Sequence, residues 1–328
     1  MGRWMSGLAV CLFLACSVAV EAEETRLVRF GLITDVHVCD RPDGANVITY
    51  NADVRYFSGG LAKLEAFARA QNQEGSAFIA ELGDFTDNPV DAKLPHEKRR
   101  QAALGFAEAA ESKLALFKGA RYHAFGNHDT DQCSKEDYST KVTNTGISVP
   151  PGQFYYSWNA GGVHFVILDA AHKPDGSPYS GIPGAPGAGY SWMDANIPPG
   201  EIEWLKRDLA GTTAPTIVLL HQELNPEEQV DPDFNQVFRV RNAAEVRSVL
   251  EKSGVVIAVF SGHYHEPGYQ LVNGIHYVML QANVAYGNDA SYHNQFATVD
   301  VLADGRNFRV LVNGNARQKT HILKASLK

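Results

Sequence analysis

The 328-residue sequence predicts an α/β fold, and three observations support that prediction. Short apolar runs rich in Val, Ile and Phe recur along the chain at strand length, and stretches with helical spacing separate the early runs. Hydrophobic residues make up 45% of the chain and charged residues 20%, which suits a globular protein with a sizeable core. No composition break, repeat or low-complexity tract divides the chain, so we expect a single domain over residues 23–328.

Eight apolar runs are predicted strands because their length and β-branched content fit a sheet. They cover residues 27–33, 77–82, 163–168, 216–220, 255–260, 275–280, 296–301 and 308–312, and a shorter run lies at 122–125. Helical spacing appears at residues 61–68, 103–114, 202–209 and 243–252, the last ending at Gly254, a typical glycine C-cap. Because no helix separates the last strands, we expect them to pair antiparallel, in a central mixed sheet or a two-sheet sandwich flanked by helices.

The first 22 residues have the pattern of a secretory signal peptide. Arg3 precedes an apolar run over residues 8–20, and Val20-Glu21-Ala22 offers a small-residue cleavage site before Glu23. The run is short for a membrane span, and no other stretch is long enough for one. We therefore expect a secreted or periplasmic protein without a transmembrane helix in its mature form; a buried helix, a membrane anchor or a lipoprotein attached at Cys16 are the alternatives.

Charge and cysteine content limit the partners of the mature chain. The formal net charge is −8, and the one basic cluster, residues 98–100, lies in a mixed-charge stretch, so nucleic-acid backbone binding is not expected. Divalent cations can still attract an anionic substrate to an acidic protein. Once Cys11 and Cys16 leave with the signal peptide, Cys39 and Cys133 remain, and the sequence leaves open whether they form a disulfide or stay as separate thiols.

A long loop over residues 173–200 is rich in Pro and Gly and carries Tyr179, Tyr190 and Trp192. Loops of this length are uncommon in compact domains unless they have a function. The sequence allows two interpretations, a lid or substrate platform and a variable insertion packed on the surface.

Polar residues follow the carboxyl ends of five predicted strands. They are Asp35 and His37, then Asp84 and Asp87, then Asn127, His128 and Asp129, then His221, and last His263 and His265. In open α/β sheets the carboxyl ends of strands face one crevice, so these side chains are expected to converge. Imidazole nitrogens with carboxylate and amide oxygens, and no thiolate, suit a pair of divalent ions such as Mn, Fe or Zn.

Each of these motifs is weak when taken alone, because a Gly-Asp pair is often a turn and a single His is often only hydrogen-bonded. Their shared position at strand ends makes the combination specific. His123 and His164 lie within strands and are expected to be hydrogen-bonded in the core. No role is assigned to His172, His276 or His293.

The order D-x-H, G-D-x-x-D, G-N-H-D, H and G-H-x-H, from residue 30 to residue 265, resembles the calcineurin-like metallophosphoesterase family. The resemblance implies a four-layer α/β/β/α sandwich with mixed sheets. It also implies two metal sites that share Asp84 as a bridging ligand. The first would be formed by Asp35, His37, Asp84 and His265, and the second by Asp84, Asn127, His221 and His263.

The same resemblance implies a mechanism. A hydroxide held between two metal ions about 3.5–4 Å apart would attack phosphorus in line, without a covalent phosphoenzyme. His128 would give a proton or hydrogen bond to the leaving oxygen, and Asp87 would orient it. Asp129 would support the loop or cap the next turn. Asp87 stands where a purple acid phosphatase has a ligating tyrosine, so an Fe–Tyr centre is not expected.

Several short segments resemble the manganese-dependent ADP-ribose and CDP-alcohol diphosphatase branch, and the cyclic-nucleotide phosphodiesterase branch shares much of them. They are residues 31–37, 155–157, 165–169, 204–205 and 262–265, with Gly268 and Tyr269. Hydrolysis of a small phosphoester, a phosphodiester or pyrophosphate of nucleotide type, is therefore the leading prediction. An exported phosphomonoesterase and a non-catalytic scaffold are the alternatives. The oligomeric state is not predicted.

Overall fold

The computed structural model describes residues 24–44, 55–189, 193–225, 238–285, 294–315 and 318–327. The predicted signal peptide, Tyr190, Trp192 and His293 lie outside these described residues. Within the described residues, no helix has the length and apolar content that crossing a membrane requires.

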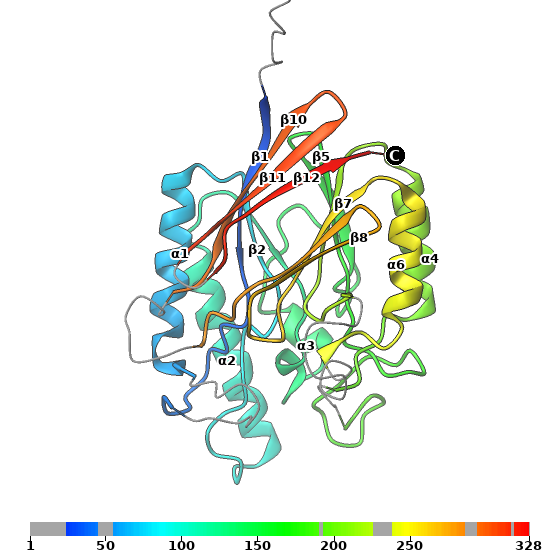
Figure 1. Ribbon diagram of the computed structural model, residues 1–328. Helices are drawn as coiled ribbons and strands as arrows, with labels where there is room; N and C mark the ends of the chain where they lie inside the picture. The colour runs from blue at the N-terminus through cyan, green and yellow to red at the C-terminus, as the bar shows by residue number, and fades with distance from the viewer. Residues whose placement is uncertain are drawn as a thin grey trace, which may run out of the picture.

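Two six-stranded sheets form the centre of the molecule (Figure 1). The first sheet has the order β12-β11-β10-β1-β2-β3, and the second has the order β4-β5-β6-β7-β9-β8. The strands are β1 (Thr25–Ile33), β2 (Phe78–Glu81), β3 (Ala120–His123), β4 (Tyr156–Ala160), β5 (Val163–Ile167), β6 (Thr216–Leu219), β7 (Val256–Ser261), β8 (Gly268–Val272), β9 (Ile275–Met279), β10 (Ala297–Asp304), β11 (Asn307–Gly314) and β12 (His321–Ser326).

Both sheets are mixed. In the first, β1, β2 and β3 run parallel, while β10, β11 and β12 pair antiparallel beside β1. In the second, β5, β6, β7 and β9 run parallel, and the edge strands β4 and β8 are antiparallel. The expected antiparallel pairing of the last strands is confirmed. Because they run parallel, β1, β2 and β3 have their carboxyl ends on the same side of the first sheet. The carboxyl ends of β6 and β7 likewise lie together in the second sheet.

Helices cover the outer face of each sheet. The helices are α1 (Gly60–Glu74), α2 (His96–Leu114), α3 (Lys135–Ser139), α4 (Pro199–Ala210) and α6 (Ala243–Ser253), with short 3-10 turns η1 (Phe57–Gly59) and η2 (His128–Thr130). The apolar faces of α1 and α2 pack on the first sheet, and those of α4 and α6 pack on the second (Figure 1). This arrangement is the predicted four-layer α/β/β/α sandwich.

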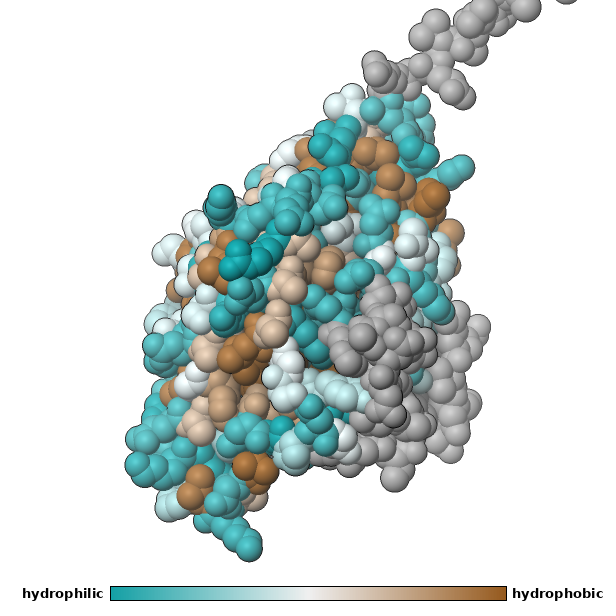
Figure 2. All heavy atoms as spheres, turned by 90° about the vertical axis from the view of Figure 1, so that its left-hand side faces the viewer, coloured by the Kyte–Doolittle hydropathy of each residue, from teal (hydrophilic) through white to brown (hydrophobic). Residues whose placement is uncertain are grey.

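The main core lies between the two sheets. Phe30 and Phe78 of the first sheet are stacked with ring centroids 4.9 Å apart, and Phe165 of the second sheet meets the ring of Phe78 edge-on at 4.8 Å. These rings are at most 1% exposed. The face on the α1 side of the molecule is mainly hydrophilic, with apolar side chains in smaller areas between polar ones (Figure 2). The two sheets pack face to face because their inner faces bury these apolar side chains.

The predicted strands and helices all form, with ends shifted by a few residues. Helix α6 ends at Gly254, whose φ of 69° is the left-handed conformation expected of a glycine cap. The sequence prediction missed β4, β8, β12 and α3.

Candidate metal centre

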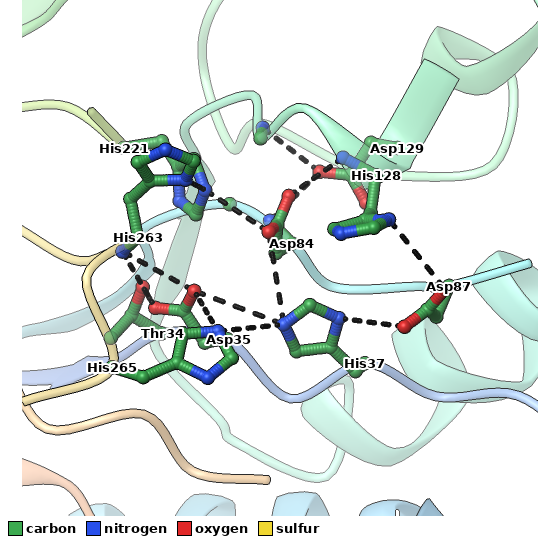
Figure 3. A network of polar contacts seen from close by, with 12 residues as sticks. Thr34, Asp35, His37, Asp84, Asp87, His128, Asp129, His221, His263 and His265 are labelled. Carbon is green, nitrogen blue, oxygen red and sulfur yellow. Dashed lines mark hydrogen bonds and ion pairs between the residues drawn. The ribbon is translucent and has the colours of Figure 1, made fainter. Parts of the chain in front are cut away.

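The predicted site residues lie at the carboxyl ends of strands from both sheets (Figure 3). Asp35 and His37 follow β1, Asp84 and Asp87 follow β2, and Asn127 and His128 follow β3, all in the first sheet. His221 follows β6, and His263 and His265 follow β7, in the second sheet. The seven predicted metal ligands are at most 6% exposed.

The backbone at the site is in an uncommon conformation. Among the described residues, six non-glycine residues have positive φ, and five of them are predicted ligands. These are Asp35 (54°), His37 (52°), Asp84 (53°), His263 (70°) and His265 (67°). L-residues adopt this left-handed region at an energetic cost, and such residues concentrate at functional sites. The turns after β1, β2 and β7 are therefore shaped to aim side chains rather than to continue a sheet.

Gly83 lets the two sheets approach each other at the site. A Cβ atom at this position would lie 2.6 Å from the backbone nitrogen of Gly126 and 2.9 Å from the Cβ of His221. Its φ of 96° is also strained for other residues. Gly83 is thus required where the β2, β3 and β6 loops meet.

Asp35, His37 and His265 form one group that could hold a metal ion. His265 Nε2 lies 3.2 Å from Asp35 Oδ1 and 3.2 Å from His37 Nε2. The Asp35 carboxylate is itself fixed, because the Thr34 hydroxyl donates to it at 2.6 Å and the His263 backbone N–H donates at 3.1 Å. Two imidazole nitrogens and a carboxylate oxygen therefore face one point.

Asp84, His221 and His263 form a second group. His221 Nε2 lies 3.2 Å from Asp84 Oδ2 and 3.2 Å from His263 Nδ1. The same Oδ2 lies 3.7 Å from His37 Nε2, a member of the first group. Asp84 thus stands between the two groups, where a bridging carboxylate would lie.

Outer hydrogen bonds select which nitrogen of His37 and of His221 faces the site. His37 Nδ1 lies 3.1 Å from Asp87 Oδ2, and His221 Nδ1 lies 2.9 Å from the carbonyl oxygen of Leu82. A proton held on Nδ1 leaves Nε2 with its lone pair directed inward, the usual arrangement of a metal-binding histidine.

Electrostatics keep the Asp84 carboxylate ionised. Burial acts to raise the pKa of Asp84, but the facing imidazoles of His221 and His128 outweigh burial and hold its pKa below the ordinary value. An ionised carboxylate is the form that binds a cation.

The donor set fits a pair of divalent cations. Asn127 Oδ1 is buried, and within the described part of the chain it has no hydrogen-bond partner. An unsatisfied buried acceptor is costly, and two imidazole nitrogens in contact lack a hydrogen-bonding reason to face each other unless one is protonated. A cation bound at each group would occupy the lone pairs of the facing imidazole nitrogens, and an amide oxygen such as Asn127 Oδ1 is a suitable further ligand. The residues present therefore fit the predicted two-metal site.

His128 is placed differently from the other histidines. Its side chain is 23% exposed, and its backbone N–H donates to Asp84 Oδ1 at 2.8 Å. Nδ1 lies 2.7 Å from Asp131 Oδ2 but 3.5 Å from Asp87 Oδ1. Burial opposes the charge of the ring, yet Asp131 and Asp87 raise the pKa of His128 to about 10. Asp131 was missed in the sequence, although it lies three residues after His128, a spacing that puts both on one face of a helical turn.

Asp129 supports the loops rather than capping a helix. Its Oδ2 accepts hydrogen bonds from the backbone N–H groups of Asp84 at 3.1 Å and Gly126 at 3.0 Å, and its Oδ1 accepts from the N–H of Thr86 at 3.1 Å. One carboxylate therefore ties the β3 loop to the β2 loop that carries Asp84.

Two other histidines pair with carboxylates outside the site. His164 Nε2 is hydrogen-bonded to Asp208 Oδ2 at 2.9 Å, as predicted, whereas His123 makes an ion-pair contact of 3.0 Å from Nε2 to Glu111 Oε2. Cys39 and Cys133 are free thiols, so the structure has the second of the two predicted possibilities, separate thiols without a disulfide.

Comparison with known proteins agrees with this geometry. The family model of the calcineurin-like phosphoesterases matches residues 28–267. A manganese-dependent ADP-ribose/CDP-alcohol diphosphatase of Bos taurus is 21% identical, over 91% of this chain and 94% of the relative. A protein of the same description from Oryza sativa is 22% identical over 85% of this chain and 93% of the relative.

Among solved structures, a dimetal phosphatase from Danio rerio shares the fold. It superposes with a TM-score of 0.71 at 19% sequence identity, over 92% of this chain and 100% of that structure.

Proposed function

The chain belongs to the calcineurin-like phosphoesterase family and is a phosphoester hydrolase, and we propose that it hydrolyses the pyrophosphate bond of small nucleotide-type diphosphates with two divalent cations. The observation that carries the two-metal part is the paired grouping of Asp35, His37 and His265 with Asp84, His221 and His263. Bound there, two cations supply Lewis acidity toward phosphoryl oxygens and lower the pKa of water.

The residues of the chain divide the remaining work. Asp84 and the inward-facing nitrogens of His37 and His221 would hold the cations in fixed positions, so little reorganisation would be needed during reaction. His128, the partly exposed member of the site, would give a proton to the leaving oxygen.

The curated relatives act on diphosphates by their names, which favours a diphosphate over a monoester for this chain. An arginine beside the metal groups supports the same choice. Arg41 Nη1 lies 3.4 Å from Asp87 Oδ1, whereas Arg55, 3.6 Å from Asp87 Oδ2, is only 5% exposed and is a buried partner of Asp87. The Arg41 side chain is 24% exposed. This positive charge, beyond that of the cations, suits a substrate with a second phosphate.

The test compares a diphosphate with a monoester. Purified protein is stripped of metal, reloaded with Mn²⁺ and assayed on ADP-ribose and on AMP in parallel. We expect ADP-ribose to be converted to AMP and ribose phosphate with the higher kcat/KM. Asp84→Asn should abolish turnover, whereas Asp175→Asn, an exposed carboxylate outside the site, should leave it unchanged.

A preference for AMP would replace the diphosphatase proposal by the phosphomonoesterase alternative. A preference for ADP-ribose that survives in Asp84→Asn would show that the metal centre described above is not the site.

We also propose that residues 1–22 are a signal peptide and that the remaining single domain acts outside the cytoplasm, which rests on the sequence pattern of that segment. N-terminal sequencing of the protein recovered from its native compartment should give Glu23 as the first residue. An intact Met1 would overturn the proposal.

A further inference from the structure

Two aspartates lie near the His128 ring, and each has a different set of partners. Asp87 uses Oδ2 for His37 Nδ1 at 3.1 Å, and its Oδ1 accepts the backbone N–H of Asn88 at 2.6 Å. Asp131 uses Oδ2 for His128 Nδ1 at 2.7 Å. The distance from Asp87 to His128, 3.5 Å, exceeds that of a normal hydrogen bond.

The Asp131 carboxylate is held in position. The Asn88 side-chain amide donates to its Oδ2 at 2.6 Å, and Gln132 in turn donates to the Asn88 side-chain oxygen. The backbone N–H of Asp131 donates to the carbonyl of His128 at 3.1 Å, so carboxylate and imidazole belong to one helical turn. The Asp131 side chain is 6% exposed, which keeps water from competing for the bond.

Gly181 of the proline- and glycine-rich loop packs against the backbone of this turn. The N–H of Gly181 donates to the carbonyl of Cys133 at 2.9 Å. A Cβ atom at Gly181 would overlap the Thr130 oxygen and lie 2.5 Å from the backbone nitrogen of Gln132. Glycine is therefore needed there, and the loop limits how far the turn can move.

We propose that Asp131, and not Asp87, is the positioning residue of His128 in phosphoester hydrolysis, while Asp87 positions His37 for metal binding. This inference rests on the proposed function. A carboxylate that accepts from Nδ1–H fixes the ring plane, so that Nε2–H points to the reacting group. In Figure 3 the ring nitrogen opposite Nδ1 lies on the side that faces Asp84.

The step that depends on this bond is departure of the leaving group. A water molecule gives one proton to solvent as its oxygen bonds to phosphorus, and the bond from phosphorus to the leaving oxygen breaks. The electron pair of that bond goes to the leaving oxygen, which takes the proton from His128 Nε2, and solvent returns a proton to the ring afterwards. A leaving group that is a weak base departs without the proton, whereas an ordinary alcohol or phenol requires it.

The leaving-group test uses p-nitrophenyl and phenyl esters of one nucleotide with the Mn²⁺-loaded protein. General acid catalysis contributes about 10²–10⁴-fold, so Asp131→Asn should lower kcat for the phenyl ester at least about tenfold more than for the p-nitrophenyl ester. Asn88→Ala removes the brace on Asp131 and keeps the backbone N–H bonded to Asp87. It should shift the ratio of the two rates in the same direction, by a smaller factor.

The matched variant is Asp87→Asn. It should lower both rates by a similar factor and weaken Mn²⁺ binding, measured calorimetrically, by about 10–100-fold. Asp131→Asn should bind Mn²⁺ as the wild type does. If Asp87→Asn changes the ratio of rates and Asp131→Asn leaves it unchanged, the assignment is reversed and the proposal is wrong.

A spectroscopic measurement separates this inference from the proposed activity. The ring ¹⁵N chemical shifts of His128 in the metal-free protein report the hydrogen bond made by Nδ1–H, and we expect Asp131→Asn to change them and Asp87→Asn to change them less. An inactive wild-type enzyme with these shifts would overturn only the proposed activity. Unchanged shifts in Asp131→Asn would overturn the positioning role itself.

Discussion

At the scale of single residues, the site depends on a carboxylate outside the predicted ligand set. This residue is Asp129, which is 2% exposed and accepts three backbone N–H groups from the β2 and β3 loops. A buried donor that loses its acceptor costs about 1–3 kcal/mol. The geometry of Asp84 therefore depends on a residue that need not contact a metal.

Replacing Asp129 tests this dependence. Asp129→Ala leaves three buried donors unsatisfied, so we expect the free energy of unfolding to fall by about 3 kcal/mol or more. Mn²⁺ affinity should fall by about 10–100-fold. Urea unfolding of the metal-free protein and calorimetric Mn²⁺ titration measure the two effects, and Asp129→Asn, which keeps one oxygen acceptor, should lose less of both. Wild-type values for the alanine variant would contradict the role given to Asp129.

The sequence singled out every residue of the two metal groups but not Asp131. The metal groups were identifiable because each lies directly after an apolar strand, a local pattern. The choice between Asp87 and Asp131 as partner of His128 depends on how the loop after β2 packs against η2. This is tertiary packing, which a local sequence pattern does not show. The available signal was the three-residue spacing from His128 to Asp131.

At the scale of elements, the missed segments are those with weak local patterns. Strand β8 is only partly buried along its length, and β12 buries only Leu323 and Ala325. Helix α3 has five residues, too few for a periodic signal. Ser134 and Asp137 form a capping box, which is the one local signal for this helix in the sequence. Buried strands were predicted because their apolar runs are continuous.

A buried cluster formed by α3 and the segment between β5 and the proline- and glycine-rich loop should respond to pH. Lys135 Nζ lies 2.6 Å from Asp169 Oδ2 and 3.5 Å from His172 Nε2. Burial, and then the charge of Lys135, lower the pKa of His172 to about 4, against about 6.5 in an unfolded chain. Between these values the unfolded chain binds a proton that the folded protein does not.

Stability should therefore be lost as the pH falls from about 6.5 toward 4, by up to about 3 kcal/mol from this residue. We expect His172→Gln to flatten the dependence of unfolding free energy on pH, measured by urea unfolding of the metal-free protein at pH 7 and pH 5. The control is His96→Gln, which removes a partly exposed histidine. Equal slopes in the wild type and His172→Gln would show that the buried cluster does not restrict protonation.

At the scale of the whole molecule, the site joins the two sheets. The N–H of His263, from the second sheet, donates to Asp35 of the first, and His221 of the second sheet bonds the carbonyl of Leu82 in the first. The four-layer arrangement itself came from the resemblance of the motifs, because hydrophobic periodicity does not tell which sheet a strand joins. Only the folded pairing of both sheets assembles the ligands.

Metal binding should consequently stabilise the whole fold. A ligand that binds only the folded state contributes about 2.7 kcal/mol at a free concentration of 100 Kd for each site. We expect a chelator to lower the Tm and added Mn²⁺ to restore it in a concentration-dependent way. Asp84→Asn, which removes the residue between the two groups, should lose most of this response, while Asp175→Asn should keep it. A Tm that does not depend on Mn²⁺ in the wild type would mean that the ligands converge without binding this ion, and the same titration with Zn²⁺ or Fe²⁺ would then identify the cation that the folded site accepts.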